Sequence, residues 1–319
     1  MLASNSPKSG AKRGLFRRKS RLVQIAGAAR FAGAAAPQFV RRIQSERRRS
    51  VAPAPFVPNP KKWPDHGLHA AWLGHSTVLL KLDGFTILTD PVLGLRCGIR
   101  MGPMTLGLKR LVAPAILRHD LPQIDLILLS HAHFDHFDLA TLRALERSGT
   151  TVVTAKNTSD LLRVRRYKSV HELGWDERIR VGPAALRGIP VNHWGARMHT
   201  DVQRGYNGYL IETQHHRVVF GGDTALTDSF RSVRSSRPVD LAIMPIGAYD
   251  PWIRVHCNPE QAWRMGADCG AEFLLPVHHQ TFQLSREPYF EPVERFVEAA
   301  GSQPERVVAT RIGHQWSED

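Results

Sequence analysis

Residues 124–149 combine three features that together restrict the fold: an apolar run, a polar connection and a capped helix. The run from Ile124 to Ser130 is continuously apolar, as in a strand buried on both faces. Asp138 is placed as a helix N-cap, leucines follow on one face, and Gly149 is the expected stop. The connection, "HAHFDHF", therefore lies between a strand and a helix, where layered α/β proteins often carry their sites.

Short apolar runs recur along residues 65–319 and alternate with helical patterns. An early group of strands and a later strand–helix alternation predict a layered α/β body with a mixed sheet. A second helix is predicted from Asn258 as N-cap, through Pro259, to Gly270. The expected strands are "HAAWL", "TVLLKL", "FTILTD", "IDLILLS", "TVVTA", "ALRGIPV", "GYLIET", "RVVFGGD", "VDLAIMPI" and "EFLLPV".

The charge is concentrated at one end of the chain. Residues 1–50 hold thirteen Lys and Arg against the single acid Glu46, so they carry +12 of the total charge of +14. We expect residues 1–50 to be a disordered basic tail, 51–64 to be a Pro-rich linker and 65–319 to be the folded domain. A basic amphipathic segment that rests on an anionic membrane or grips nucleic acid is the alternative for the tail. A secretory signal is disfavoured because Arg30 interrupts its apolar stretch.

Three cysteines, Cys97, Cys257 and Cys269, are too few and too scattered for a disulfide framework. Their odd number and the lack of a C-x-x-C motif argue for a reducing compartment and against a cysteine-based metal site. No apolar run reaches the roughly 18 residues of a membrane-spanning helix. We therefore expect a cytoplasmic protein, peripheral on the inner membrane surface if the basic tail binds lipid.

The H-x-H-x-D-H pattern of the connection favours metal binding. His131 and His133 lie two apart in an extended segment and can point the same way, whereas the adjacent Asp135 and His136 should point in different directions. One loop can thereby serve two neighbouring ions, and these ligand types suit zinc, with manganese or iron as alternatives. The alternative is a polar loop with mutually hydrogen-bonded histidines, which is disfavoured because burying so many ionisable groups is costly.

Four side chains cannot complete two metal shells, so further ligands are expected at other strand ends. Three later strands end in suitable residues: His193 in "GIPVNHW", Asp223 in "VVFGGDTAL", and His278 with His279 in "LLPVHHQTF". Each alone could be a surface residue or a turn. Their joint occurrence after buried strands favours a composite metal site.

Taken together, these features resemble those of the metallo-β-lactamase superfamily. The segments "WLGHSTVLLKLDGFTILTDPVL", "IDLILLSHAHFDHFD", "FGGDTAL", "MPIGAYDPWIRVHCNPEQA" and "PVHHQTF" resemble, in order, those of the N-acylphosphatidylethanolamine-hydrolysing phospholipase D group. The resemblance spans about residues 65–314 and is more distant to the ascorbate-phosphate lactonase-like branch. It implies a four-layer αββα sandwich with a dinuclear metal site at the strand ends.

Position by position, the resemblance implies two metal ions, expected to be zinc. One would be held by His131, His133 and His193, and the other by Asp135, His136 and His278, with Asp223 between them. His278 is chosen over His279 because the group usually has an aliphatic residue, then His-Trp-Gly-Thr-Phe. Here His279 and Gln280 replace the Trp and Gly, so the lining of the pocket departs from that of the group.

The resemblance also implies a mechanism in which a hydroxide between the two ions attacks phosphorus or an acyl carbon. Asp135 would orient this hydroxide as well as bind metal. His256 is the candidate for contacting a substrate oxygen or protonating the leaving group, and its alternative is a surface residue at a helix start. Tyr249 and His279 are the candidate substrate-binding residues.

Two further residues are expected to orient the metal ligands. Asp90 and His75 both follow strands that the family places beside the metals, and such groups accept the second N–H of ligand imidazoles. Asp90 could alternatively be only a turn residue before Pro91.

The substrate is predicted least directly. Residues 91–118 contain no acid and interleave apolar with basic side chains, which suits contact with anionic lipid, or alternatively a loop over the sheet edge. The leading hypothesis is hydrolysis of a phosphodiester such as an N-acyl phospholipid, with lactones or small esters as alternatives. A nuclease is less favoured because residues 51–319 carry only +2, and a non-catalytic metal-binding protein does not need an open dinuclear site. The oligomeric state is left open.

Overall fold

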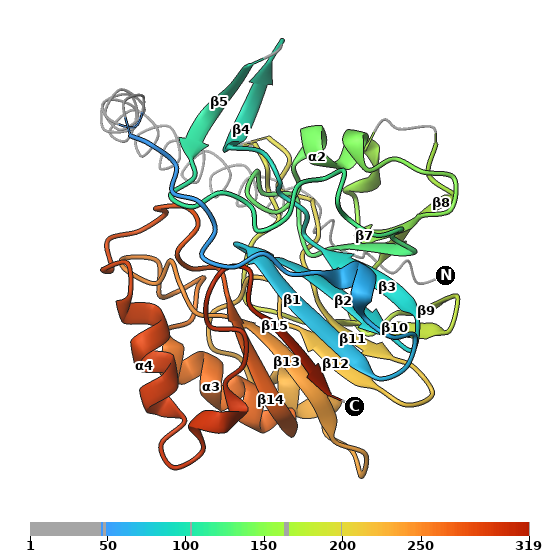
Figure 1. Ribbon diagram of the computed structural model, residues 1–319, viewed down its shortest axis with the longest axis vertical. Helices are drawn as coiled ribbons and strands as arrows, with labels where there is room; N and C mark the ends of the chain where they lie inside the picture. Colours follow the sequence, from blue (N-terminus) through green and yellow to red (C-terminus); the bar gives the residue numbers. More distant parts are fainter. Residues whose placement is uncertain (1–45, 47–48, 103, 163–165, 199, 319) are drawn as a thin grey trace, which may run out of the picture. The chain divides into compact units, whose positions relative to one another are not determined.

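The computed structural model describes residues 46, 49–102, 104–162, 166–198 and 200–318. The chain divides between Arg49 and Ser50, and the architecture below belongs to residues 50–319 (Figure 1). The predicted disordered tail lies almost entirely outside the described residues. None of the described helices has both the length and the apolar character needed to cross a membrane.

The first sheet has seven strands in the order β15-β1-β2-β3-β6-β7-β8. β15, β1, β2 and β3 pair antiparallel, and β3, β6, β7 and β8 pair parallel, which confirms a mixed sheet. The strands are β1 (Leu68–Gly74), β2 (Thr77–Leu82), β3 (Phe85–Thr89), β6 (Leu126–Leu129), β7 (Thr151–Ala155), β8 (Ser169–Leu173) and β15 (Gln315–Glu318).

The second sheet has six strands in the order β14-β13-β12-β11-β10-β9. Like the first sheet it is mixed: β9 to β12 pair antiparallel, and β12 to β14 pair parallel. Its strands are β9 (Arg178–Val181), β10 (Ala184–Ile189), β11 (Gly208–Glu212), β12 (Arg217–Phe220), β13 (Val239–Pro245) and β14 (Ala271–Val277).

The alternation of side chains along β13 shows how the layers pack. Leu241 and Ile243 belong to the core between the two sheets. Ala242 and Met244 belong to a second core, where the outer face of this sheet meets Met265 and other residues of the helices. Both faces of the strand are therefore buried, which explains its continuous apolar sequence. Helices on the outer faces of two stacked sheets complete the predicted αββα sandwich (Figure 1).

In the described part of the chain, three α-helices flank the sheets: α2 (Leu139–Ala144), α3 (Pro259–Asp268) and α4 (Glu291–Ala299). Asp138 caps α2 and Asn258 caps α3 in a capping box, as predicted. The expected stop of α2 at Gly149 is wrong, because the helix ends at Ala144 and a turn follows. Four short 3₁₀ turns connect the layers: η1 (Pro60–Lys62), η2 (Ser159–Leu161), η3 (Ser229–Val233) and η4 (Pro304–Arg306).

Residues 91–118 contain a feature that the sequence did not predict. They form the hairpin of β4 (Arg96–Met101) and β5 (Met104–Lys109), a separate two-stranded sheet that projects from the body (Figure 1). The Pro-rich linker, residues 51–64, has no strand but does contain η1, and Ala52 pairs with Val112 near the base of the hairpin.

Candidate metal centre

Strand direction brings the candidate residues to one edge of the sandwich. In the first sheet β1, β3 and β6 run in the same direction, and in the second β10, β12 and β14 do so. Each of these six strands is followed within four residues by a candidate side chain. Because carboxyl ends of like-directed strands meet at one edge of a sheet, distant parts of the sequence converge there. The six residues are His75, Asp90, His131, His193, Asp223 and His278.

The connection after β6 changes conformation half-way. His131 and His133 lie in its extended part, but the amide N–H groups of His136 and Phe137 both donate to the carbonyl of His133. The segment therefore turns, and Asp135 and His136 reach the same place: His136 Nε2 lies 3.7 Å from Asp135 Oδ2. The expectation that these adjacent side chains point in different directions is wrong, because it assumed an extended backbone.

The first group of converging side chains, the three-histidine cluster, consists of His131, His133 and His193. His133 Nδ1 lies 2.8 Å from His131 Nε2 and 3.3 Å from His193 Nε2. His193 Nδ1 donates to the carbonyl of Val255 at 2.8 Å, so in the neutral ring Nε2 carries the lone pair and faces the cluster. His131 and His193 are buried, whereas His133 is partly exposed and opens the cluster to solvent.

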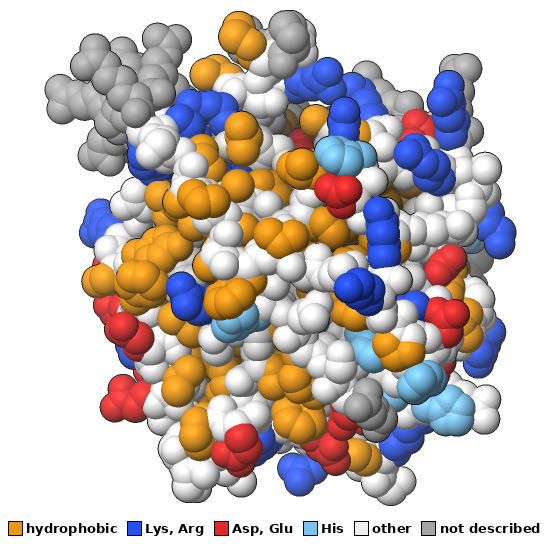
Figure 2. All heavy atoms as spheres, viewed as in Figure 1, with side chains coloured by type: hydrophobic (Ala, Val, Ile, Leu, Met, Phe, Trp, Pro, Cys, Tyr) orange, Lys and Arg blue, Asp and Glu red, His pale blue; other side chains and the backbone are white. Residues whose placement is uncertain are grey.

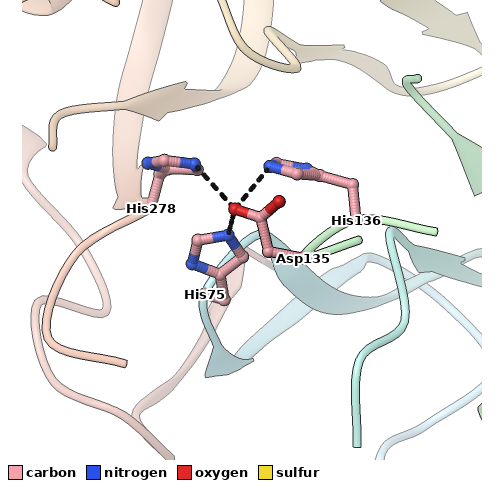
Figure 3. Close-up of side chains that lie close together, drawn as sticks. All are labelled: His75, Asp135, His136 and His278. Atoms are coloured by element: carbon pink, nitrogen blue, oxygen red, sulfur yellow. Dashed lines mark hydrogen bonds and ion pairs between the residues drawn. The ribbon is translucent and has the colours of Figure 1, made fainter. Parts of the chain in front are cut away.

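The second group, the Asp135 cluster, consists of Asp135, His136, His278 and His75. Three imidazoles point at one carboxylate oxygen of Asp135 (Figure 3). His75 Nε2 lies 3.0 Å from Asp135 Oδ2, and His278 Nε2 lies 3.8 Å from it. The side chain of Asp135 is 16% exposed, so this cluster is also open on one side.

Asp223 lies between the two clusters. Its Oδ2 atom is 3.2 Å from His136 Nε2 and 3.1 Å from His278 Nε2 in the Asp135 cluster. The same oxygen is 3.8 Å from His193 Nε2 and 4.0 Å from His131 Nε2 in the three-histidine cluster. A single carboxylate therefore faces both groups. The turn before Asp223 requires glycine at position 222. Gly222 has φ +58°, and a Cβ atom added there would lie only 2.5 Å from the carbonyl oxygen of Asn207.

Asp90 fixes the orientation of two imidazoles from behind. Its Oδ2 accepts from His136 Nδ1 at 2.7 Å and from the Ser130 hydroxyl at 2.5 Å. Since that hydroxyl donates to Asp90, its oxygen accepts from His131 Nδ1, 2.8 Å away. Both rings therefore present Nε2 to the interior of the site. Ser130, which sequence reasoning missed, directly precedes the histidine pattern.

The ionisation of the site suits cation binding. Burial lowers the pKa of His131 and His193 well below 6.5, which leaves both rings neutral. Burial opposes ionisation of Asp135 and Asp223, but His136 and its neighbours outweigh it and hold both pKa values well below 3.8. Burial likewise opposes protonation of His136, yet Asp223 and Asp135 raise its pKa well above 6.5. Positive charge is thus favoured between these carboxylates.

Several buried polar atoms support the same conclusion. Among the described residues, the Nε2 atoms of His136 and His278 and the Oδ1 atom of Asp223 have no hydrogen-bond partner. Buried polar atoms rarely remain without one, so this group needs a missing ligand. Imidazole nitrogens and carboxylate oxygens are ligands for zinc, manganese or iron, and the residues present fit such ions.

The other predicted residues lie around the clusters. His256 is buried, which excludes the surface alternative, and its Nδ1 lies 3.7 Å from Asp223 Oδ2. His279 is not part of either cluster, because its ring stacks on Trp72 with centroids 4.4 Å apart. Tyr249 is directed toward α4, where its hydroxyl donates to Glu291. The structure thus brings His256 to the centre and places Tyr249 apart from both clusters.

The chain is similar in sequence to several known proteins. The family model described as "Beta-lactamase superfamily domain" matches residues 86–279. The chain belongs to the metallo-β-lactamase superfamily. An uncharacterized protein of Mycobacterium tuberculosis is 35% identical over 81% of this chain and 71% of its own length. The N-acyl-phosphatidylethanolamine-hydrolyzing phospholipase D 1 of Caenorhabditis elegans is 30% identical over 73% of this chain and 70% of its own length.

Solved structures show the same fold. The structure of a possible metal-dependent hydrolase from Veillonella parvula has a TM-score of 0.63 and 17% identity, and the match covers 79% of this chain and 100% of that one. With its His/Asp clusters, the chain is a metal-dependent hydrolase of the metallo-β-lactamase superfamily.

Arg197 supports the histidine-rich loop in this superfamily member and was not predicted. Its Nη1 donates to the carbonyls of Ala132 and Phe137, both at 2.8 Å, and its guanidinium lies 3.9 Å from the ring centroid of Phe134. It lies four residues after His193. The arginine therefore ties the segment that carries one histidine to the loop that carries the others.

A cavity of about 200 Å³ adjoins the Asp135 cluster. His278 and His279 lie on its wall, together with the apolar side chains of Phe282 and Leu284 and the carboxylate of Glu287. An apolar wall with a few polar groups beside reactive residues is typical of a substrate site.

Proposed function

We propose that the chain hydrolyses a phosphodiester, with an N-acyl phospholipid as the leading substrate class, by means of two metal ions. The observation that carries the proposal is the position of Asp223, whose Oδ2 faces the three-histidine cluster and the Asp135 cluster at 3.1 to 4.0 Å. The substrate class is supported by the 30% identical phospholipase D relative. Lactones and small esters remain alternatives, since the same residues would serve them.

In this proposal His131, His133 and His193 would hold one ion, and Asp135, His136 and His278 would hold the other. Asp223, which faces both clusters, would contribute to each. When bound, two such ions would activate a water and stabilise negative charge on the reacting phosphate. We expect zinc, because imidazole and carboxylate ligands suit it, and manganese or iron would bind the same ligands.

The protein's own groups orient ligands and substrate. Asp90 and Ser130 hold the rings of His136 and His131 in the orientation that presents Nε2. His75 plays a similar part for Asp135, at 3.0 Å. Such outer contacts fix ligand geometry and raise ligand basicity.

His256 is proposed to contact the substrate. Burial lowers its pKa to about 4, so the ring is neutral at ordinary pH and is suited to donate a hydrogen bond to a substrate oxygen. Its Nδ1 has no hydrogen-bond partner among the described residues, which leaves this atom available. Proton transfer to the leaving group is less favoured in a ring that burial keeps neutral.

The test combines metal analysis of the purified protein with a screen of N-acyl phospholipids, soluble phosphodiesters and lactones. We expect two equivalents of metal per chain and turnover of the phosphodiesters. Asp135→Asn should abolish hydrolysis while the circular-dichroism spectrum stays that of the folded protein. Hydrolysis that survives this substitution, or turnover of lactones alone, would contradict the proposal.

A further inference from the structure

The β4–β5 hairpin has two chemically different faces. Opposite residues in an antiparallel pair share a face, and the face alternates along each strand. Ile99 pairs with Leu106. The Cys97–Leu108 pair, two positions nearer the body, lies on the same face. The other face carries Arg96 opposite Lys109 and Arg100 opposite Thr105, with Gly98 opposite Gly107 between them. The hairpin is therefore apolar on one face and basic on the other.

The apolar face is covered only near the body. Cys97 and Leu108 pack against Val92, Phe282 and Leu284. Farther out, large apolar side chains are exposed: Ile99 is 47% exposed, Met104 71% and Leu106 47%. Leu95, directly before β4, is also 56% exposed. Figure 2 shows apolar side chains on the projecting hairpin, with basic side chains around it.

The β4–β5 hairpin lacks the stabilisation that pairing with further strands would provide. It forms hydrogen bonds with neither large sheet, and an isolated two-stranded ribbon is marginally stable in water. Exposed apolar side chains gathered at one place commonly mark an interaction surface. Residues 91–118 contain no Asp or Glu, so the segment itself has a net positive charge.

The base of the hairpin adjoins the cavity beside the Asp135 cluster. Phe282 and Leu284, which contact its apolar face, also line the cavity beside His278, and Leu111 just after β5 lines it too. The apolar surface of the hairpin and the apolar wall of the cavity thus share residues.

We propose that the β4–β5 hairpin is a membrane-docking element for an anionic bilayer. Its outer apolar face enters the boundary between headgroups and acyl chains, and Arg96, Arg100 and Lys109 meet lipid phosphates. The cavity beside His278 then lies next to the membrane surface, where a lipid substrate can enter it. This inference rests on the proposed function for its lipid substrate, but docking itself requires no turnover.

The direct test places a fluorophore on the hairpin of the full-length protein. The three native cysteines are buried, so Met104→Cys can be labelled selectively with an environment-sensitive dye. Vesicles of phosphatidylglycerol and phosphatidylcholine should shift the emission to shorter wavelength. Val57→Cys, in the linker and 76% exposed, is the matched control and should show no shift. The proposal is wrong if both positions respond alike, or if the shift depends on protein concentration and not on lipid, which would indicate a second copy of the chain.

The second test measures partition to the same vesicles by sedimentation. Leu106→Ser should weaken partition roughly tenfold, because a large apolar side chain stays in water. Arg100→Gln should weaken it about fivefold on anionic vesicles and leave binding to pure phosphatidylcholine unchanged. Turnover of a soluble phosphodiester should persist in both variants, and Asp135→Asn should bind vesicles like wild type. Failure of the proposed function would thus leave the docking result standing. If the basic tail alone carries binding, the hairpin variants will partition like wild type, and the inference is overturned.

Discussion

The two sheets contribute to the metal centre in different ways. At the edge of the first sheet, the candidate groups bond to one another: His131 to Ser130, Ser130 to Asp90, and Asp90 to His136. At the edge of the second sheet, His193, Asp223 and His278 each follow a separate strand. Among the described residues, Asp223 Oδ1 and both ring nitrogens of His278 have no hydrogen-bond partner.

This difference means that hydrogen bonds within the first edge orient its side chains, whereas the second edge contributes to the site through the stacking of the sheets. The first-edge side chains are held by short-range hydrogen bonds within one loop and one neighbouring strand end. The second-edge side chains meet them only when the two sheets are stacked correctly, since Asp223 Oδ2 approaches His136 Nε2 to 3.2 Å across the layers. A metal ion would supply the attraction that the unpartnered atoms lack.

The largest expected effect comes from breaking the link between the two edges at Asp223. Asp223→Asn keeps the shape of the side chain but removes the charge that faces both clusters. Metal content should fall, and turnover should drop by more than the roughly 100-fold typical of a residue outside the ligand set. Elemental analysis and steady-state kinetics check this result. A variant that retained two metal ions and wild-type turnover would show that the edges do not share this carboxylate.

Weakening the hydrogen bonds of the first edge should have a smaller effect. Asp90→Asn replaces one carboxylate oxygen with an NH2 group, which cannot accept a hydrogen bond. Either the Ser130 amide, or the Ser130 hydroxyl together with His136 Nδ1, then loses its acceptor. We expect turnover or metal affinity to fall roughly 10- to 100-fold. The measurement is a metal titration followed by activity. Wild-type affinity in this variant would reduce Asp90 to the turn residue that its position before Pro91 also allows.

The contrast between the edges also explains what the sequence could predict. The first-edge pattern is local: six residues after an apolar run carry the signal, and the structure places them together. His193, Asp223 and His278 were recognisable as strand ends, but their grouping came from the family resemblance, because no local pattern states which strands are neighbours. Ser130 carried no signal of its own, since its role depends on the neighbouring strand that bears Asp90.

The least predictable parts are those whose structure depends on the rest of the fold. The hairpin strands contain Gly98 and Gly107 at facing positions, which weakens any strand signal in "RCGIRM" and "MTLGLK". The edge strands β8, β9 and β15 are short and partly exposed, so their sequences lack the continuous apolar runs of the central strands. Five of the six strands whose ends carry the metal candidates lie inside their sheets, and the sixth, β14, is an edge strand with a mostly buried apolar run. All six were predicted.

A third substitution, at Arg197, tests the contact between the segment after His193 and the histidine-rich loop. This contact involves no candidate metal ligand. Arg197→Lys keeps the charge but cannot donate to the carbonyls of Ala132 and Phe137 with the same planar group. The free energy of unfolding should fall by about 1.5–3 kcal/mol, the usual contribution of hydrogen bonds to a charged group. Thermal or urea unfolding measures it. The matched control is Arg187→Lys, whose guanidinium bonds Ser232 at the surface. An equal loss in both variants would argue against a specific role for Arg197.

The smallest expected effect concerns the last residue of the histidine-rich segment. The carboxylate of Asp138 caps α2 by accepting from the amides of Ala140 and Thr141, and it also accepts from the Thr141 hydroxyl. Asp138→Asn should change the free energy of unfolding by less than about 0.5 kcal/mol, because Asn and Asp cap helices about equally well. Metal content and turnover should equal those of wild type. Asp135, three residues earlier, should tolerate no such change, so the two substitutions compare a metal candidate with a helix cap in the same loop. Loss of metal from the Asp138 variant would show that the helix cap also holds the loop in its metal-binding conformation.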